Sequence, residues 1–452
     1  MKAKFRSPQL CVPTLAFFSL LFLIIAHSSS RMPAQAQGNL SFDRDRGRGM
    51  LKVIKDDIKK NYYDPNFRGI DLDARFKAAD EKMQQAQSLG QVFGIIAQVL
   101  LDFDDSHTFF LPPSRTDSVE YGWQMQAIGD KCYVAAVKPG SDAEAKGLQP
   151  GDLLLNVAGF KPTREMVWKI NYLLYSLRPM PALSVALQKP NGEQKQIEIQ
   201  ARIKRGKRVL DLTGRDGGSD INALIREAES EDRLNRHRYI ELGEDAFIWK
   251  MPQFDLNEGQ VDDLIDKAKK RKALILDLRG NGGGAETTLK RLASYFVDKE
   301  SKVGDLKGRK EMKPLIVKSR GADVYTGKLI ILVDSQSGSA SEVFARLMQL
   351  EKRATVIGDR TAGAVMRSEH HQHQMGNDTV FFYGVSVTDA DLIMTDGKSL
   401  ERVGVAPDES LLPSASDLAA KRDPVLSRAA ELVGVKLPAD KAGAMFPIEW
   451  RK

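Results

Sequence analysis

Two nearly uninterrupted apolar runs constrain the fold of this chain more than any other feature. Ala273 to Leu278 and Lys328 to Val333 each have the length of one strand, and polar residues do not alternate within them. Such runs are typical of parallel strands buried on both faces beneath covering helices. Helices are expected over 258–270, 285–297 and 341–352. Residues 239–452 are therefore predicted to form an α/β core.

This core is predicted to end with antiparallel strands and one helix. Thr379 to Thr388 is interpreted as strand, and Asp417 to Val433 as a single closing helix. The whole chain is accordingly assigned to the α/β class, as a multidomain α+β protein.

The part of the chain that precedes the core divides into three segments. Residues 40–118 show helical spacing of apolar side chains, whereas residues 119–205 change to short strands with turns. Within the second segment, Leu183–Gln188 and Lys195–Gln200 are expected to pair as a hairpin across Pro190-Asn191-Gly192. Residues 206–238 are polar and charged, and are interpreted as a linker or irregular insertion.

The first 36 residues are interpreted as a targeting segment. A basic start is followed by the apolar run Leu15 to Ala26, and Ala34-Gln35-Ala36 offers a cleavage site flanked by small residues. An uncleaved inner-membrane anchor is the alternative, but Pro13 and Ser19 interrupt the apolar stretch. The mature protein is thus expected in the periplasm or outside the cell, with membrane contact only during export.

Composition argues against a nucleic-acid-binding protein and against a fold held by disulfides. The net charge of +7 falls to +3 once the four basic residues of the targeting segment are removed, which is too little to indicate a nucleic-acid partner. Cys11 leaves with the same segment, so Cys132 stays alone and no intrachain disulfide can form.

A serine-rich turn is the first candidate for chemistry. Ser335 to Ala340 lie between a buried strand and the helix that Ser341-Glu342 opens. Such a turn presents a side chain beside the free N–H groups of a helix start, where a developing oxyanion is stabilised. The alternative is that these serines only cap the helix, and the local sequence gives both interpretations about equal weight.

A glycine-rich loop favours the catalytic interpretation. Leu278-Arg279-Gly280-Asn281-Gly282-Gly283-Gly284 also follows a buried strand, and its spacing matches neither the Walker pattern nor the dinucleotide fingerprint. Glycines allow backbone N–H groups to approach a reacting atom closely. We therefore expect an oxyanion hole formed by the N–H groups of Gly283 and Ala340.

These motifs resemble those of the C-terminal processing and tricorn-core serine peptidases. The glycine-rich loop, Ser-Gly-Ser-Ala-Ser-Glu at 337–342 and Leu-Glu-Arg-Val-Gly-Val-Ala-Pro-Asp at 400–408 occur in the family's order. The resemblance covers nearly all of the chain after residue 36. It implies a serine endopeptidase that forms an acyl-enzyme on a protein or peptide substrate, without a metal or other cofactor.

The resemblance also implies individual roles. The family's nucleophile corresponds to Ser339, which leaves Ser335, Ser337 and Ser341 as loop or cap residues. The processing branch would place a lysine at position 364, where this chain has alanine, so a Ser/Lys dyad is excluded there. The tricorn-like branch uses histidine instead, and in this chain the corresponding residues are as follows: His107 as general base and acid, Glu401 as the group that holds the imidazole, and Ser106 as an auxiliary hydrogen-bonding residue.

Residues 119–205 resemble a PDZ domain in the circularly permuted arrangement of bacterial proteases. The resemblance rests on Gly-Leu-Gln-Pro-Gly-Asp at 147–152 and on the order of the expected strands. A PDZ groove accepts an extended peptide by strand addition. The expected groove strand contains Gly122, Trp123, Gln124 and Met125.

Other interpretations stay open at this point. His370, His371 and His373 could suggest a metal site, although a solvated hairpin strand is favoured, and His371 is the main rival of His107 as base. A non-catalytic ligand- or peptide-binding protein on the same core is the alternative function. Neither the substrate's identity nor an oligomeric state follows from the sequence.

Overall fold

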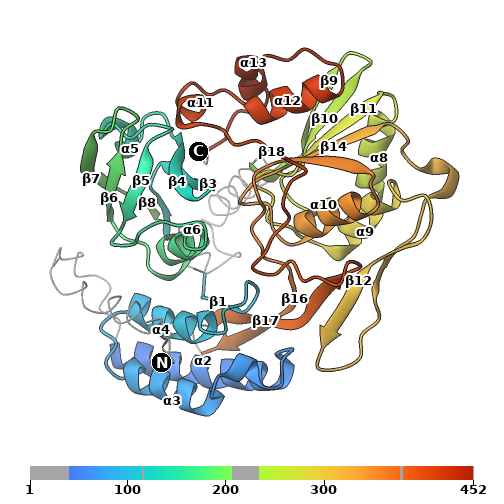
Figure 1. Ribbon diagram of the computed structural model, residues 1–452. Coiled ribbons are helices and arrows are strands. Elements are labelled where there is room, and N and C mark those ends of the chain that lie inside the picture. Colours follow the sequence, from blue (N-terminus) through green and yellow to red (C-terminus); the bar gives the residue numbers. More distant parts are fainter. Residues whose placement is uncertain (1–39, 115–116, 206–233, 377–379, 451–452) are drawn as a thin grey trace, which may run out of the picture.

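The computed structural model describes residues 40–114, 117–205, 234–376 and 380–450 (Figure 1). The predicted targeting segment, 1–36, and most of the predicted linker, 206–233, lie outside the described residues. Among the helices of these described ranges, none has the length and apolar character needed to cross a membrane.

A six-stranded sheet forms the core, in the order β18-β15-β14-β11-β10-β9. Within this sheet β10, β11, β14, β15 and β18 pair in parallel, and β9 pairs antiparallel with β10 at one edge. The predicted buried strands, β11 (Ala273–Asp277) and β14 (Lys328–Val333), lie side by side at its centre, which confirms the α/β assignment. The remaining bounds are β9 (Arg238–Leu242), β10 (Ala246–Lys250), β15 (Ala354–Gly358) and β18 (Glu409–Ser410).

Helices cover both faces of this sheet (Figure 1). Leu274 and Leu276 of β11 point into one apolar core and Ile275 into the other, which explains why the run does not alternate. The first core includes α8 (Glu258–Ala268), α9 (Glu286–Ser294) and α10 (Ala340–Leu350), and the second includes α12 (Pro424–Leu432) and α13 (Ala439–Met445). Since β11 and β14 are parallel, the loops that follow them meet at one edge of the sheet.

A second sheet carries the N-terminal helices. Its strands are β1 (Phe109–Leu111), β17 (Phe381–Met394), β12 (Ser301–Gly308) and β13 (Leu315–Val317), with β16 (Met366–Met375) paired to β17. Val385 and Val387 of β17 pack against α2 (Leu40–Asn61), α3 (Leu72–Met83) and α4 (Leu89–Leu101). Because β1 pairs with β17, the segment just before β1 is brought from the helical region to the core.

Residues 117–205 form a separate β-rich module. The predicted hairpin is confirmed, because β6 (Ala182–Gln188) pairs with β7 (Gln194–Gln200). The five-stranded sheet has the order β3-β4-β5-β6-β7, so that β3 (Trp123–Ile128) is an edge strand. The other elements are β2 (Asp117–Glu120), β4 (Lys131–Val137), α5 (Asp142–Ala145), β5 (Leu153–Val157), α6 (Val167–Asn171), a π-helical turn (Tyr172–Leu177) and β8 (Arg202–Arg205).

The single closing helix predicted over Asp417–Val433 is wrong. The chain forms α11 (Ala415–Ala419), turns at Lys421 with φ 54°, and begins α12 at Pro424. Asp423 accepts a hydrogen bond from Leu426 N–H at 2.9 Å and so caps the new helix. Proline at the first helical position and an aspartate cap before it are start signals that interrupt the apolar periodicity.

Candidate active site

Ser339 lies in the predicted turn between β14 and α10. Its backbone adopts φ 51° and ψ −118°, which costs a residue with a side chain about 1–3 kcal/mol. The Ser339 N–H donates to the carbonyl oxygen of Ala364 at 2.9 Å and to Glu342 Oε2 at 3.1 Å. An ordinary serine cap has extended backbone angles and needs no such strain. The conformation therefore favours a functional serine over a simple helix cap.

Glu342 is a buried carboxylate that fixes the backbone around Ser339. It accepts hydrogen bonds from Thr361 Oγ1 at 2.5 Å and from the N–H groups of Gly363 and Ala364, each at 2.8 Å, in addition to that of Ser339. Burial raises the pKa of Glu342 to about 7, although these hydrogen bonds oppose the increase. From the sequence alone, Glu342 is expected only to open a helix.

The raised pKa of Glu342 predicts a specific pH dependence of stability. Between pH about 4.5 and about 7 the folded protein binds this proton more tightly than the unfolded chain does, so the free energy of unfolding falls as pH rises. The contribution is at most about 3 kcal/mol. Urea denaturation at pH 5 and pH 7 should show a smaller pH difference in Glu342→Gln than in wild type. An equal difference in both proteins would contradict the assignment.

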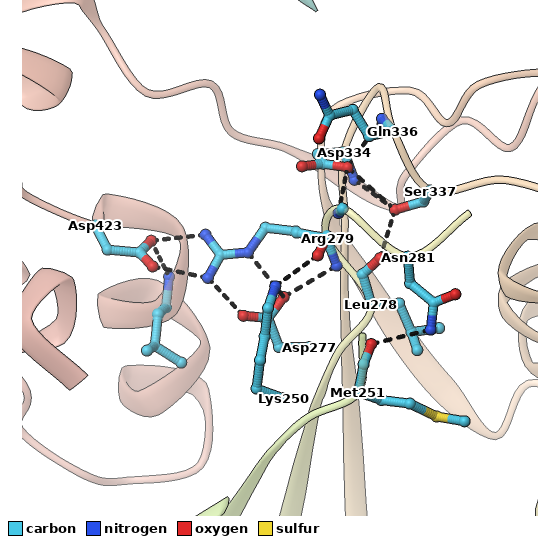
Figure 2. A network of polar contacts seen from close by, with 12 residues as sticks. Lys250, Met251, Asp277, Leu278, Arg279, Asn281, Asp334, Gln336, Ser337 and Asp423 are labelled. Atoms are coloured by element: carbon cyan, nitrogen blue, oxygen red, sulfur yellow. Dashed lines mark hydrogen bonds and ion pairs between the residues drawn. The ribbon is translucent and has the colours of Figure 1, made fainter. Parts of the chain in front are cut away.

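The glycine-rich loop lies directly against Ser335 to Ala340, here called the nucleophile turn after the role predicted for Ser339 (Figure 2). A Cβ atom at Gly283, where φ is 105°, would lie 2.5 Å from the Cβ atom of Ser339, so only glycine fits this approach. The carbonyl oxygen of Asn281 accepts from Gly338 N–H and from Ser341 Oγ, both at 2.9 Å. The two loops are thus joined by direct hydrogen bonds on either side of Ser339.

The predicted oxyanion hole is only half available in this structure. Gly283 N–H donates to Asn281 Oδ1 at 2.8 Å, and Asn281 Nδ2 in turn donates to the Met251 carbonyl oxygen at 2.9 Å. Ala340 N–H begins α10 and has no acceptor among the residues that the structure describes. The prediction for Gly283 overlooked the amide two residues earlier, which competes for its N–H group.

Ser106, His107 and Glu401 form one hydrogen-bonded relay. Ser106 Oγ donates to Glu401 Oε2 at 2.8 Å and lies 2.7 Å from His107 Nδ1. Ser106 N–H also donates to Glu401 Oε1 at 2.8 Å. The sequence predicted a direct contact between Glu401 and the imidazole, whereas the structure places the Ser106 hydroxyl between them. Ser106 is therefore a linking member of the relay.

This arrangement selects one tautomer of His107. The Ser106 hydroxyl has a single proton, and that proton is donated to Glu401. Ser106 Oγ can then only accept from His107, which requires the imidazole proton on Nδ1. The lone pair is left on Nε2, where a general base needs it.

Burial adjusts the charge of both ends of the relay. It lowers the pKa of His107, an effect that Asp105 partly opposes, and so favours the neutral imidazole. Burial raises the pKa of Glu401, which the hydrogen bond from Ser106 opposes. His107 is therefore neutral near neutral pH.

Asp105 holds the relay in place and was not singled out from the sequence. It is 1% exposed, and its Oδ1 accepts from the N–H groups of His107 at 3.0 Å and Thr108 at 2.7 Å. Thr388 Oγ1 of β17 donates to the same oxygen at 2.8 Å. An aspartate that accepts N–H groups two and three residues later is a common turn signal, which Asp105-Ser106-His107 carries.

Two consecutive residues connect this relay with the nucleophile turn. Ala364 N–H donates to Glu342, and the next residue, Val365, donates its N–H to Glu401 Oε2 at 2.9 Å. Neighbouring Cα atoms are 3.8 Å apart, so the two carboxylates flank one short stretch of backbone. Ala364, which replaces the lysine of the processing branch, accepts the Ser339 N–H with its carbonyl oxygen. Ala364 and Val365 thus join the turn of Ser339 to the relay.

The three histidines of β16 lie outside this relay. His373 Nε2 contacts Asp57 Oδ2 of α2 at 2.6 Å, and His371, two residues earlier, lies on the same face of the strand. His370 lies on the other face and packs edge-on against Phe109. In the described ranges, no group of three or more histidine, cysteine, aspartate or glutamate side chains is placed to hold a metal ion.

The predicted groove strand faces a large cavity between the β-rich module and the core. Gly122, Trp123, Gln124 and Met125 help to line this space of about 1560 Å³. Trp123 and Met125 are each 5% exposed, whereas Gln124 points outward. The outer edge of β3 contacts the nucleophile turn, since Ser335 Oγ donates to the Ala127 carbonyl oxygen and Gln126 Nε2 donates to Asp334 Oδ2 at 2.7 Å.

Sequence comparison identifies the core that carries these groups. The sequence profile of peptidase family S41 matches residues 248–411, which include the glycine-rich loop, Ser339 and Glu401. The core of this chain, residues 248–411, matches peptidase family S41. Ser106 and His107 lie outside the matched range.

The S41 relatives are named as proteases. The tail-specific protease of Haemophilus influenzae is 26% identical over 276 residues, 57% of this chain and 36% of that protein. A probable CtpA-like serine protease of Staphylococcus haemolyticus is 25% identical over 80% of this chain and 66% of its own length. The carboxy-terminal processing protease CtpA of Bacillus subtilis is 22% identical over 90% of this chain and 77% of that protein. This chain therefore spans about a third of the Haemophilus protein and about two thirds of the Staphylococcus protein. The names of all three relatives support a serine peptidase.

A solved structure supports the fold independently. Mature CPAF superimposes with a TM-score of 0.61 at 16% identity, covering 84% of this chain and 94% of that chain. At this identity the similarity concerns the fold alone.

Proposed function

We propose that this chain is an exported serine endopeptidase that cleaves peptide bonds through an acyl-enzyme on Ser339. The observation that carries the proposal is the relay Glu401–Ser106–His107, which the backbone of Val365 and Ala364 joins to a strained serine at a helix start. A serine hydroxyl becomes an effective nucleophile when a nearby base removes its proton, and the tautomer set by Ser106 gives His107 that capacity.

The reaction would proceed in two stages. His107 Nε2 takes the proton of Ser339 Oγ as the oxygen attacks the peptide carbonyl, and Ala340 N–H stabilises the oxyanion. His107 then gives its proton to the leaving amine, and the acyl-enzyme is hydrolysed by water through the same steps. Glu401 stabilises the imidazolium through the Ser106 hydroxyl, which can relay the charge without moving.

Covalent labelling tests this function directly. A serine-directed fluorophosphonate should form one adduct per chain, and peptide mapping by mass spectrometry should place it on Ser339, with loss of peptide cleavage. Ser335→Ala is the matched control, because Ser335 Oγ already donates to the β-rich module. Absence of an adduct, or an adduct that moves to another serine of the turn, would contradict the proposal.

Ser106→Ala should show how much the relay contributes to kcat while Ser339 stays in place. Without the hydroxyl, Glu401 no longer fixes the His107 tautomer, and we expect kcat to fall by about 10²-fold. Ser106→Thr retains the hydroxyl and should recover most of this loss. Steady-state cleavage of a fluorogenic peptide measures both variants, and an unchanged kcat in Ser106→Ala would remove Ser106 from the relay.

We further propose that residues 119–205 act as a PDZ domain that engages the substrate. β3 offers an edge for strand addition near Gly122–Gln124. Trp123 Nε1, on the wall of the cavity, is buried and has no hydrogen-bond partner in the described part of the chain. A buried donor without a partner is costly, so a bound peptide oxygen is a suitable acceptor for it.

Trp123→Phe tests this engagement with little change of volume. Loss of one hydrogen bond of about 1 kcal/mol should raise KM about fivefold for peptides that occupy the groove, with kcat unchanged. Trp168→Phe on α6 is the control, since Trp168 does not border the cavity. Equal KM values in both variants would exclude a role of Trp123 in peptide binding.

Export is proposed from residues 1–36 alone, by their basic start, apolar run and small-residue site. Sequencing of the N-terminus of the protein recovered outside the cytoplasm should begin at Gln37. Recovery of a chain that retains residue 1 in the membrane fraction would favour the anchored alternative.

A further inference from the structure

Arg279 joins the glycine-rich loop to two acidic residues at once (Figure 2). Its Nε and Nη2 donate to Asp277 Oδ1 and Oδ2 at 2.9 and 2.8 Å. Its Nη1 and Nη2 donate to Asp423 Oδ1 and Oδ2 at 2.9 and 2.7 Å. Both contacts are two-pronged, which is the geometry that fixes a guanidinium group most firmly.

Asp423 is held firmly at the start of α12, the helix that packs in the second apolar core. It caps α12 through Leu426 N–H, and its own N–H donates to the Ala439 carbonyl oxygen at 2.8 Å. Val425 and Leu426 pack into the second apolar core against Ile330 of β14. The helix is therefore held by apolar contacts, and the ion pair with Arg279 extends from an already anchored element.

The backbone of Arg279 forms the base of the catalytic loops. Its N–H donates to Asp277 Oδ1 at 3.0 Å, and its carbonyl oxygen accepts from Lys250 Nζ at 2.5 Å. The next residue, Gly280, donates its N–H to Asp334 Oδ1 at 2.9 Å. Asp334 is the residue directly before the nucleophile turn. A displacement of Arg279 would therefore also move the glycine-rich loop and the nucleophile turn, which lie on either side of Ser339.

Apolar packing and the Asp423 cap already hold α12, so the ion pairs of Arg279 are not required to fold this helix. Buried ion pairs contribute little net stability because desolvation offsets their attraction, whereas they do fix geometry. Asp277 is 1% exposed, and the Arg279 and Asp423 side chains are 18% and 17% exposed. Burial raises the pKa of Asp277, but Arg279 and Lys250 outweigh it and hold that pKa well below its usual range, so the carboxylate is charged.

We propose that Asp423 and Arg279 are positioning residues, through which the C-terminal helices hold the glycine-rich loop against Ser339. This inference rests on the proposed peptidase activity, which it deepens. It makes α12 part of the catalytic apparatus, because both residues would act through the glycine-rich loop, although they also line the large cavity.

Asp423→Asn isolates the positioning contact from the helix cap. Asparagine caps helices as well as aspartate does, so α12 should persist, but the charged two-pronged contact with Arg279 is lost. A shift of a catalytic group by about 1 Å can cost about 10²-fold in rate. We expect kcat per titrated active site to fall about 10- to 100-fold, with KM for short peptides unchanged.

Matched variants distinguish positioning from general destabilisation. Asp71→Asn makes the same change at the cap of α3, where Asp71 Oδ1 accepts from Ala74 N–H, and should leave kcat unchanged. Arg279→Lys retains a charge beside Asp277 but cannot form both forks, and should lose activity like Asp423→Asn. The double variant should be no worse than either single one, since residues of one network are not additive.

Hydrogen exchange supplies a readout that does not need catalysis. In Asp423→Asn, amides of residues 278–284 should exchange faster than in wild type, while those of α4 should not. Slower turnover per active site together with faster loop exchange would support the proposal. Wild-type turnover and exchange, or a lower melting temperature and active fraction with unchanged turnover per site, would overturn it. If the wild type neither labels nor cleaves, the peptidase proposal fails, and loop exchange alone then decides the positioning claim.

Discussion

Ser339→Ala is expected to lower kcat for peptide hydrolysis by about 10⁵- to 10⁶-fold, because it removes the atom to which the acyl group is transferred. The methyl group fits the same turn, and the bonds that fix the residue 339 backbone come from its N–H rather than its side chain. KM for a bound peptide should therefore change little. Steady-state kinetics on a fluorogenic peptide, with melting temperature measured alongside, separates the loss of chemistry from a loss of folding.

The neighbouring serines serve as internal controls for that result. Ser337 Oγ donates to the Leu278 carbonyl oxygen at 2.8 Å and Ser341 Oγ to that of Asn281, so both have structural partners. Their alanine variants should lower stability more than they lower turnover per active site. If Ser339→Ala retained more than about 1% of wild-type kcat, the nucleophile would have to be another residue.

His107→Ala should cost nearly as much as Ser339→Ala, about 10⁵-fold in kcat, because the serine then has no base. The structure supports this expectation through the Nδ1 contact with Ser106, which leaves Nε2 for the proton of the nucleophile. Above the lowered pKa of His107 the effect should not depend on pH, since the imidazole is already neutral. Turnover of the purified variant at pH 7 and pH 8 measures both points.

The double variant tests whether the two residues act as one unit. Ser339→Ala/His107→Ala should be no slower than either single variant, because removal of one member already disables the other. A loss that multiplied across the two substitutions would instead indicate independent contributions, and would separate His107 from the nucleophile.

Much of the fold follows from local sequence. The runs at 273–278 and 328–333 determine β11 and β14 because a strand buried on both faces needs apolar side chains on both. Helix starts were harder to place where start signals lay inside a periodic stretch, as at Asp423-Pro424. Strands β12 and β13 were not expected, since their pairing depends on β17 far along the chain.

For the candidate site too, some features follow from the sequence and others only from the structure. Ser339, His107, Ser106 and Glu401 could be named from motifs, and the structure brings the last three into contact. The order of contacts could not be read from sequence, because the insertion of the Ser106 hydroxyl depends on residues 295 positions apart. The four hydrogen bonds to Glu342 and the competition of Asn281 for Gly283 N–H are likewise tertiary details.

If the relay through His107 activates Ser339, one rate constant should reveal it. The second-order rate constant for fluorophosphonate labelling of Ser339 should be measured at pH 7 in wild type, His107→Ala and His371→Ala. We expect a loss of at least about 10³-fold in His107→Ala and a change within about twofold in His371→Ala. Labelling that survives in His107→Ala and disappears in His371→Ala would contradict it.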